Sequence, residues 1–477
     1  MKFWKSILPN KNKYNSIDKK IVKEYNKTRN LKSRKHLCYA PFKSLTFFLA
    51  GDIMACWHNK QYLLGHYPED NISDIWFGEK LKKLREHIIN NDLTYGCEEC
   101  EKHIKSSDFY SAGAWRYDYL SLKKSKYPVS MDFQISNICN LECIMCNGEY
   151  SITVRQNREL KHPYTNPYDD SFIKQLEPFI PHLHEASFSG GESFVINQYY
   201  NIWEKIYEIN PNVVISVTTN GSTLNNRAKN ILEKLKFNIT LSLDSVNKEN
   251  YEFIRKNGNF ENLISNFEYY KQYALQNNTF LSVRICPLQQ NWKELPEIFN
   301  FINEQNISLF FNSVIFPPYS SLWNLSSQKL SEILNYLSSF QFENKTQIQK
   351  GNNKSYNNLI EQIAKWQNDA IKIEEKYPDL NNYDTKILLD ILIMQVNEYL
   401  KINNSFKEVK KQEFALFFEN SIKSCEHEIN NIEIYNNALR YFIGFPINRL
   451  IDEFNIRNIE KIINFTKQAG KLTLNNI

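Results

Sequence analysis

The most compact group of chemically reactive residues in this 477-residue chain is C-N-L-E-C-I-M-C, which places Cys139, Cys143 and Cys146 at the spacing C-x₃-C-x₂-C. Thiolates bind zinc and iron–sulfur clusters, and both kinds of site normally use four protein ligands. Three thiols on one loop therefore leave a fourth position to fill. A structural zinc site would take a histidine or cysteine from elsewhere, whereas a [4Fe–4S] cluster can leave one iron to a small molecule.

A second group of four cysteines lies upstream, in the segments C-Y-A-P-F, A-G-D-I-M-A-C-W and Y-G-C-E-E-C. Its members are Cys38, Cys56, Cys97 and Cys100. Their spacing alone fits zinc and iron–sulfur equally well. Gly51 with Asp52 predicts the turn of a hairpin that presents Cys56. The segment I-S-D-I-W-F-G-E-K-L-K-K-L-R-E-H-I predicts one amphipathic helix with Ser73 as its N-cap.

The composition excludes several classes of protein. A formal net charge of +5 is too small to indicate a nucleic-acid binder. No apolar run approaches the roughly 18 residues that span a bilayer. The N-terminus also lacks an apolar stretch followed by small cleavage-site residues, which is typical of a signal peptide. We therefore expect a cytoplasmic protein, in which clustered cysteines indicate metal ligands before disulfides.

Four regions follow one another along the chain. Residues 1–36 form a basic N-terminal arm, residues 37–127 hold the first four cysteines, residues 128–324 alternate strands with helices, and residues 325–477 are helical with no assigned role. The arm predicts a solvated segment or an amphipathic helix. A docking arm for an acidic partner is the alternative.

Six segments between residues 128 and 324 have the length and composition of β-strands. They are V-S-M-D-F-Q-I, E-A-S-F-S, V-V-I-S-V-T-T, N-I-T-L-S-L-D, F-L-S-V-R-I-C and S-L-F-F-N-S-V-I. Helix-length segments separate them, which predicts an α/β fold with a parallel sheet. Six units are too few for a complete eight-unit barrel, so we expect a partial barrel. Reactive groups in such folds lie at the carboxyl ends of the strands, where the cysteine loop and the glycine-rich turns fall here.

These features together closely resemble the radical S-adenosylmethionine (SAM) superfamily, which carries C-x₃-C-x₂-C after the first strand of a partial (β/α)₆ barrel. The resemblance extends over residues 128–318, through Ser189-Gly190-Gly191-Glu192, Thr219-Asn220-Gly221 and Ser242-Leu243-Asp244 after successive strands. It implies that Cys139, Cys143 and Cys146 hold a [4Fe–4S] cluster. It also implies that the amino and carboxylate groups of SAM chelate the fourth iron. The missing ligand would then be SAM itself.

The same resemblance implies the SAM-binding residues. They are Met145, Gly190, Gly191, Glu192, Asn220, Ser242, Asp244 and Arg255. In this assignment Glu192 binds the SAM amino group, and Ser242 and Arg255 hold its carboxylate or ribose. Met145 replaces the aromatic residue that often precedes the third cysteine, and it can still pack on adenine. The implied reaction is one-electron cleavage of SAM to methionine and a 5′-deoxyadenosyl radical, which abstracts hydrogen from a substrate.

The upstream cysteines resemble the auxiliary-cluster modules called SPASM and twitch domains, through C-x₁₂-G-x₄-C, a helix carrying I-W, and C-x₂-C. This implies that Cys38, Cys56, Cys97 and Cys100 ligate a second [4Fe–4S] cluster. Such modules usually follow the barrel, whereas this one precedes it.

The resemblance leaves the substrate open. A peptide or protein is expected first, and a carbohydrate or other small metabolite is the alternative. A reductant such as flavodoxin or ferredoxin is the implied protein partner. A non-catalytic, metal-stabilised binding protein is the alternative from another class. Cys286 and Cys425 stand alone in the sequence and are expected in the core, with hydrogen-atom donation to a substrate radical as the alternative role for Cys286.

Overall fold

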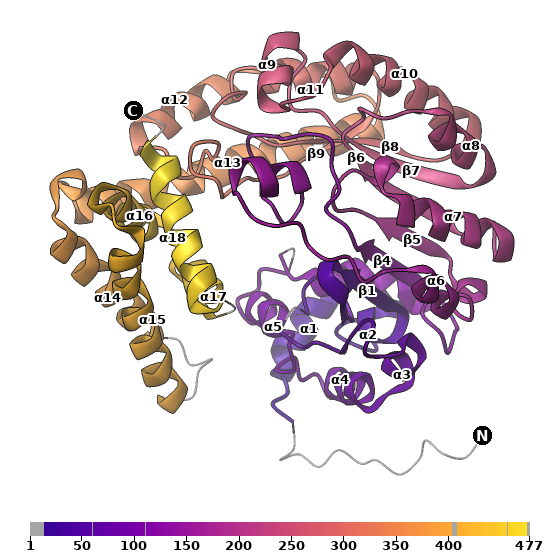
Figure 1. Cartoon of the computed structure of the whole chain (residues 1–477), viewed down its shortest axis with the longest axis horizontal. Coiled ribbons are helices and arrows are strands. Elements are labelled where there is room, and N and C mark those ends of the chain that lie inside the picture. Colours follow the sequence, from indigo (N-terminus) through magenta and orange to yellow (C-terminus); the bar gives the residue numbers. More distant parts are fainter. Residues whose placement is uncertain (1–13, 60, 110, 403–407, 456, 475–477) are drawn as a thin grey trace. The chain divides into compact units, whose positions relative to one another are not determined.

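The computed structural model describes residues 14–59, 61–109, 111–402, 408–455 and 457–474 (Figure 1). Its strands are β1 Ser44–Phe48, β2 Asp52–Met54, β3 Gly65–His66, β4 Ser130–Gln134, β5 Glu185–Phe188, β6 Val214–Thr219, β7 Lys236–Ser242, β8 Leu281–Ile285 and β9 Ser308–Phe311. The helices of the first 281 residues are α1 Lys19–Lys27, α2 Ala40–Lys43, α3 Ile72–Phe77, α4 Glu79–Ile89, α5 Glu98–Lys105, α6 Asp170–Leu176, α7 Asn197–Ile209, α8 Asn226–Lys234, α9 Lys248–Ile254 and α10 Phe260–Asn277. The later helices are α11 Leu295–Glu304, α12 Ser327–Ser338, α13 Gln347–Lys376, α14 Thr385–Ile402, α15 Glu408–Ile429, α16 Ile432–Gly444, α17 Ile447–Asn455 and α18 Ile459–Leu474.

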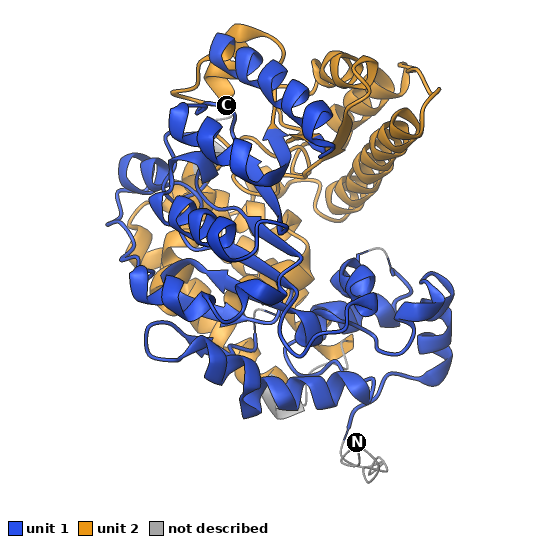
Figure 2. Cartoon of the chain, turned by 90° about the vertical axis from the view of Figure 1, so that its right-hand side faces the viewer, with its two compact units in different colours: residues 1–142, 147–241, 261–281 blue, residues 143–146, 242–260, 282–477 orange. Residues whose placement is uncertain are grey.

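The chain forms two compact units, coloured separately in Figure 2. Unit 1 consists of residues 1–142, 147–241 and 261–281, and unit 2 of residues 143–146, 242–260 and 282–477. Each unit therefore contains parts of the sequence that lie far apart. Both units include residues of the predicted partial barrel.

The sheet of unit 1 has the order β3-β2-β1-β4-β5-β6-β7. Strands β1, β4, β5, β6 and β7 are successive parallel neighbours, and β2 and β3 continue from β1 as antiparallel strands. In unit 2, β8 and β9 form a parallel pair. Strands alternating with helices confirm the predicted α/β class. The first strand of the cysteine-rich module pairs directly with β4, so this module continues the sheet.

One face of the unit 1 sheet is apolar and covered by helices. Phe47, Phe133 and Phe188 stack across three neighbouring strands, with ring centroids 5.1 and 4.8 Å apart. Phe172 from α6 and Trp203 from α7 pack edge-on against them. Burial of large aromatic side chains supplies much of the stabilisation of such a layer.

The opposite face carries polar side chains in register. The row consists of Thr46, Asp132, Ser187, Ser216 and Asn238. Residues alternate between the two faces along each strand, so the same strands supply both an apolar outer layer and a polar inner layer. A parallel sheet with one polar face is typical of a barrel wall that lines a site.

The predicted single helix over residues 72–88 is wrong in detail. The structure has α3 and α4, separated at Gly78, whose backbone is extended (φ −76°, ψ 170°). The N-cap is Asn71, whose side chain accepts a hydrogen bond from the amide of Ser73. The glycine breaks the helix because it loses more conformational freedom in a helix than any other residue. The predicted hairpin before Cys56 is confirmed, with Ala50 and Gly51 at positive φ in its turn.

The predicted helical C-terminal region is confirmed for its described residues. Its core is formed by α14 to α18 and includes Phe418, Leu439, Phe442 and Phe454, all fully buried. Cys425 lies in this core, and its sulfur contacts the carbonyl oxygen of Ser421 at 3.2 Å.

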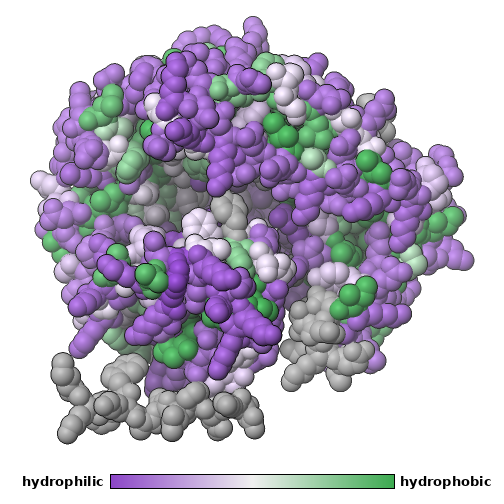
Figure 3. All heavy atoms as spheres, turned by 180° about the vertical axis from the view of Figure 1, so that it is seen from behind, coloured by the Kyte–Doolittle hydropathy of each residue, from purple (hydrophilic) through white to green (hydrophobic). Residues whose placement is uncertain are grey.

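Hydrophilic residues cover most of the coloured surface in Figure 3, with apolar side chains between them in small groups. Among the helices that the structure describes, none is both long enough and apolar enough to cross a bilayer.

Candidate functional site

In unit 1 the first cysteine of the loop lies beside the turn that follows β6. The Nδ2 atom of Asn220 is 3.8 Å from the sulfur of Cys139 and 3.1 Å from Oδ1 of Asn140. Asn140 donates to the hydroxyl of Ser222 at 2.8 Å, and that hydroxyl donates to Oδ1 of Asn220 at 2.6 Å. These bonds hold the start of the cysteine loop against the T-N-G turn. The structure thus brings Asn220 to Cys139, and its role toward SAM stays a prediction.

The glycine-rich turn after β5 packs on the backbone that leads into the cysteine loop. Gly190 and Gly191 have φ angles of +83° and +55°. A Cβ atom at Gly191 would lie 2.1 Å from the carbonyl oxygen of Ile138, and the amide of Glu192 donates to that same oxygen at 2.8 Å. Only glycine combines this conformation with this close approach at low cost.

The carboxylate of Glu192 is fully buried and holds the neighbouring turn. Oε1 accepts hydrogen bonds from the Thr219 hydroxyl at 2.6 Å and from the amide of Phe194 at 3.1 Å, while Oε2 accepts from the amide of Asn220 at 2.6 Å. Glu192 therefore fixes the T-N-G turn, a positioning role that the sequence did not indicate. Its predicted contact with the SAM amino group stays a prediction.

In unit 2 a buried ion pair lies beside the second cysteine. Nη2 of Arg255 is 2.6 Å from Oδ2 of Asp244, and Nη1 is 3.9 Å from the sulfur of Cys143. Oδ1 of Asp244 accepts a hydrogen bond from the backbone amide of Cys286 at 2.7 Å. Burial alone would lower the pKa of Arg255, but the charges of Asp244 and of the Cys143 thiolate outweigh it and raise that pKa. Arg255 therefore stays cationic.

The Nε atom of Arg255 is buried and has no hydrogen-bond partner among the described residues. An unpaired buried donor costs free energy, on the order of 1–3 kcal/mol, unless a ligand or water satisfies it. A carboxylate is a suitable acceptor for a guanidinium. The residue therefore fits the predicted role of holding an anionic group of SAM.

An apolar cluster in unit 2 surrounds the next part of the loop. Ile254, Leu288 and Val314 are buried, and Ile144, Met145 and Cys286 pack against them. Met145 thus lies on an apolar surface, as a residue that contacts adenine would. Ser242 is half-buried at the end of β7, and Cys146 is also half-buried. Cys286 is half-buried as well, so the expectation of a core position is met only in part.

The four upstream cysteines lie together in unit 1. Burial raises the pKa of each thiol, to about 12 for Cys56 and to about 11 for Cys100, and well above the ordinary value for Cys38 and Cys97. Interactions with the thiols of Cys56, Cys38 and Cys100 raise the pKa of Cys97 further. Such thiols lose their protons when a metal centre supplies the compensating positive charge.

Nitrogen donors point at these sulfurs. The amide of Ala40 donates to Cys38 at 3.4 Å, and Nδ2 of the fully buried Asn59 donates to Cys97 at 3.1 Å. The backbone amides of His58 and Asn59 donate to Cys56, and those of Gly113 and Ala114 donate to Cys100. Hydrogen bonds to cysteine sulfur stabilise thiolates and tune iron–sulfur clusters.

Within the described residues, no group of three or more His, Cys, Asp or Glu side chains converges on a single metal ion. A cubane cluster spreads its four thiolates over four irons, so its ligands need not surround one point. Four thiols that accept N–H hydrogen bonds, three of them in buried cysteines and that of Cys97 in a half-buried one, therefore fit an iron–sulfur cluster.

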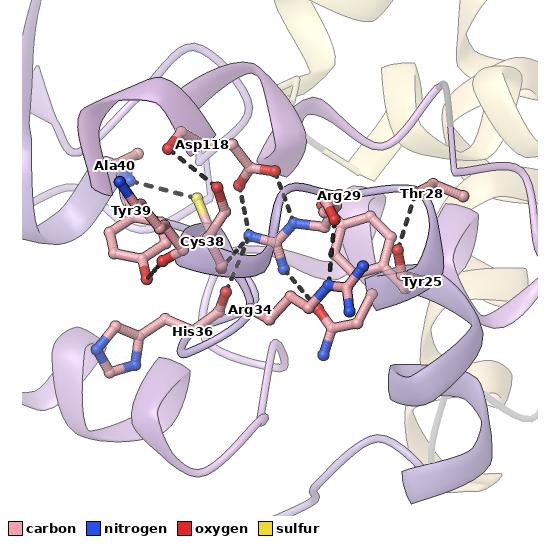
Figure 4. Close-up of polar contacts among 12 residues, drawn as sticks. Tyr25, Thr28, Arg29, Arg34, His36, Cys38, Tyr39, Ala40 and Asp118 are labelled. Atoms are coloured by element: carbon pink, nitrogen blue, oxygen red, sulfur yellow. Dashed lines mark hydrogen bonds and ion pairs between the residues drawn. The ribbon is translucent and has the colours of Figure 1, made fainter. Parts of the chain in front are cut away.

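A buried arginine orders the segment before Cys38 (Figure 4). Nε of Arg29 donates to Oδ2 of Asp118 at 2.7 Å, and Nη2 pairs with Oδ1 of the same carboxylate. Nη2 also donates to the carbonyl oxygens of Ser33 and His36 at 2.9 and 3.0 Å. Bidentate pairing of this kind is the geometry for which arginine is suited. Arg29 thus joins the end of the basic arm to the module that holds Cys38.

Asp132 lies in the polar row of the sheet, and its carboxyl group is buried. Burial raises the pKa of Asp132 to about 7, although hydrogen bonds from Ser187, Thr46 and Trp57 act in the opposite direction. The Thr46 hydroxyl donates to Oδ2 at 3.5 Å. The protein therefore carries a carboxyl group that titrates near neutral pH on the inner face of the sheet.

This titration should make stability depend on pH. The pKa of Asp132 is about 7 in the folded chain and 3.8 in its ordinary state, so the folded chain binds more protons between these values. The stability that depends on protonation of Asp132 is therefore fully present below pH 3.8, and it is lost as the pH rises through about 7. We expect the melting temperature of the wild type, measured relative to that of Asp132→Asn, to decrease between pH 5 and 7 and to level off above pH 8. Thermal unfolding across this range measures it, with Asp379→Asn as an exposed control.

Sequence patterns missed several of these positioning residues. Asn59 and Asp118 carry no spacing signal, because they meet their partners only through the tertiary fold. Arg29 had a weak signal, since it is one of only two arginines among many lysines in residues 1–36.

Both cysteine groups fall within regions that match known protein-family models. Residues 133–302 match the family model of the Radical SAM superfamily, and residues 38–101 match that of an iron-sulfur cluster-binding domain, SPASM. The two matches contain the three cysteines of the loop and the four upstream cysteines.

Curated relatives match over the barrel. The chain is 28% identical over 175 residues to a probable GTP 3′,8-cyclase of Methanocaldococcus jannaschii, covering 37% of this chain and 55% of the relative. It is 25% identical over 187 residues to a cysteine-type anaerobic sulfatase-maturating enzyme of Clostridium novyi, covering 36% and 46%. The chain thus spans about half the length of the curated relatives it matches.

Solved structures show similarity at a low level. Native anSMEcpe with bound AdoMet is 18% identical with a TM-score of 0.34, covering 44% of this chain and 60% of that chain. Streptococcus suis SuiB bound to S-adenosylmethionine is 16% identical with a TM-score of 0.32, covering 54% and 64%.

Proposed function

We propose that this chain is a radical SAM enzyme with an N-terminal SPASM domain and that it abstracts hydrogen from a peptide or protein substrate. Its cofactors are S-adenosylmethionine, the [4Fe–4S] cluster of the radical SAM domain and the auxiliary iron–sulfur cluster of the SPASM domain. When bound, the first cluster and SAM together supply one electron and a 5′-deoxyadenosyl radical, which is chemistry of the cofactor.

The residues of the chain bind and orient these groups. Cys139, Cys143 and Cys146 are proposed as cluster ligands, with the fourth position left to SAM. In unit 1 the turn at Gly190, Gly191 and Glu192 and the neighbouring Asn220 hold the first part of the loop in place.

In unit 2, Asp244 fixes the guanidinium of Arg255, which offers its Nε atom to the SAM carboxylate or ribose. Ser242 and Met145 complete the proposed SAM-binding set.

One observation carries this proposal above the others. The guanidinium of Arg255 is buried between Asp244 and Cys143 and keeps an unpaired donor. A binding protein that had lost SAM would have no need for a costly unpaired donor beside a cluster ligand. This supports a retained SAM site and weighs against the non-catalytic alternative.

The peptide or protein substrate is supported by one of the two relatives described above, whose name denotes maturation of a sulfatase. The other relative is named for a nucleotide reaction, so a small metabolite is the second candidate. The polar inner face of the sheet offers hydroxyl, amide and carboxyl groups that suit either class. A cytoplasmic location and a flavodoxin or ferredoxin as reductant complete the proposal.

Anaerobic reconstitution with iron and sulfide tests the proposal. We expect about eight irons per chain, from two cubane clusters. Dithionite with SAM should release 5′-deoxyadenosine, and deuterated substrate candidates should be screened by transfer of deuterium from the substrate into that product.

Replacing Cys97 with alanine should remove about four of these irons, because the auxiliary cluster loses one of its thiolates. SAM cleavage should continue, since the first cluster keeps its ligands, while product formation from the substrate should fail. Iron analysis, EPR and chromatography of 5′-deoxyadenosine measure the three effects. About four irons in the wild type would assign the upstream cysteines to zinc or to structure, and zinc alone without cleavage would favour the binding-protein alternative.

A further inference from the structure

The basic arm forms a hollow on unit 1. It has a volume of about 360 Å³ and its lining includes Lys19, Lys23 and Lys27 of α1 together with Arg34. The three lysines are four residues apart, which places them on one side of the helix. The rest of the lining is Val22, Asn26 and Asn91, so among described residues neither a carboxylate nor an aromatic ring lines the hollow.

The charge of this surface is largely uncompensated. Residues 14–36 contain eight lysines and arginines against two acids, Asp18 and Glu24. Lys27 pairs with Glu24 at 2.7 Å, whereas Lys19 and Lys23 have no carboxylate within ion-pair distance in the described part of the chain. Like charges four residues apart on a helix repel one another. An acidic partner would relieve this repulsion.

The hollow is connected to a ligand of the auxiliary cluster. Nε of Arg34 donates to the carbonyl oxygen of Arg29 at 3.1 Å, and Arg29 in turn binds the carbonyl of His36 (Figure 4). Cys38 follows Arg34 by four residues, so the two Cα atoms are at most about 14 Å apart. An electron can cross such a distance through protein without a chemical intermediate.

We propose that this hollow is the docking site for the acidic face of a one-electron carrier protein, which exchanges one electron with the auxiliary cluster through the segment from Arg34 to Cys38. The inference rests on the proposed function, because it requires a cluster on Cys38. One electron passes between carrier and cluster, and no bond forms or breaks. A single-stranded nucleic acid is the less suitable occupant, because such sites combine cations with aromatic rings that stack on bases.

The test measures binding and electron transfer with a flavodoxin of net negative charge. The full-length, cluster-loaded protein is compared with Lys19→Glu/Lys23→Glu and with Lys354→Glu/Lys365→Glu, a control that makes the same charge change on exposed positions of α13. Glutamates in the first turns of α1 favour the helix, so the test variant should fold. Flavin anisotropy gives the Kd, and stopped-flow absorbance gives the rate of cluster reduction by flavodoxin hydroquinone at low and high salt.

We expect the test variant to raise Kd and slow reduction by about tenfold or more at low salt, and to lose most of the salt dependence of the wild type. The control should match the wild type. Equal Kd values and reduction rates for all three proteins would overturn the docking site. It would also be overturned if the test variant lost binding to a 20-nucleotide RNA while electron transfer from flavodoxin stayed intact.

Dithionite reduction and SAM cleavage in the same samples separate this inference from the proposed function. Dithionite needs no docking surface, so cleavage with dithionite but no flavodoxin binding would overturn the docking site alone. Absence of iron from the Cys38 module would overturn both.

Discussion

Replacing Cys143 with alanine should reduce the formation of 5′-deoxyadenosine to the detection limit. This thiol is one of three on the loop, so its loss leaves two protein ligands for a cluster that normally uses more. The sulfur of Cys143 is also in contact with Arg255 in unit 2. The variant therefore removes both a cluster ligand and a contact of the Arg255 guanidinium. Chromatography of the products after incubation with SAM and dithionite measures the effect, and iron analysis should show about four irons remaining.

The control is Cys425→Ala. Cys425 is a buried thiol in the helical core, where its sulfur contacts Ser421 and Thr466. This variant also removes one cysteine, as Cys143→Ala does. Its rate of SAM cleavage should stay close to that of the wild type. Continued 5′-deoxyadenosine formation by Cys143→Ala would rule out the loop as the site of the SAM-binding cluster.

Replacing Arg255 with methionine should destabilise the protein by roughly 3–5 kcal/mol, because it leaves the carboxylate of Asp244 buried without its cation. The Asp244 side chain is fully buried and lies 2.6 Å from the guanidinium, so solvent cannot compensate the loss. Urea denaturation followed by circular dichroism measures the change in the free energy of unfolding. The variant should also bind SAM more weakly, since the free Nε donor is lost with the guanidinium.

The matched control is Lys329→Met, which breaks an exposed pair between Lys329 and Glu332 at 2.6 Å. Exposed pairs of this kind contribute about 0–1 kcal/mol, so this variant should be nearly neutral. The double variant Arg255→Met/Asp244→Asn should recover part of the lost stability, because it removes the unpaired charge. A single variant as stable as Lys329→Met would show that the ion pair is not buried in solution.

Several elements of the fold follow from local sequence patterns. The strands β4, β5, β6 and β8 lie within one or two residues of their predicted segments, because branched and aromatic side chains pack well on a pleated, half-buried surface. β9 ends at Phe311, before the predicted end of its segment. The break at Gly78 was missed because the apolar spacing continues across it.

The sequence by itself indicated the chemistry proposed for this protein. The two cysteine groups, the paired glycines and the order of turns after successive strands are all visible in it, and the three cysteines of the loop are spaced closely because local chain geometry brings such ligands together.

Only the tertiary structure decided what surrounds them. The partners of Arg29, Asn59 and Glu192 come from parts of the chain 27 to 89 residues away, and their burial depends on packing that no local pattern records. Burial also gives Asp132 its raised pKa, because desolvation is a property of the folded interior and not of the residue.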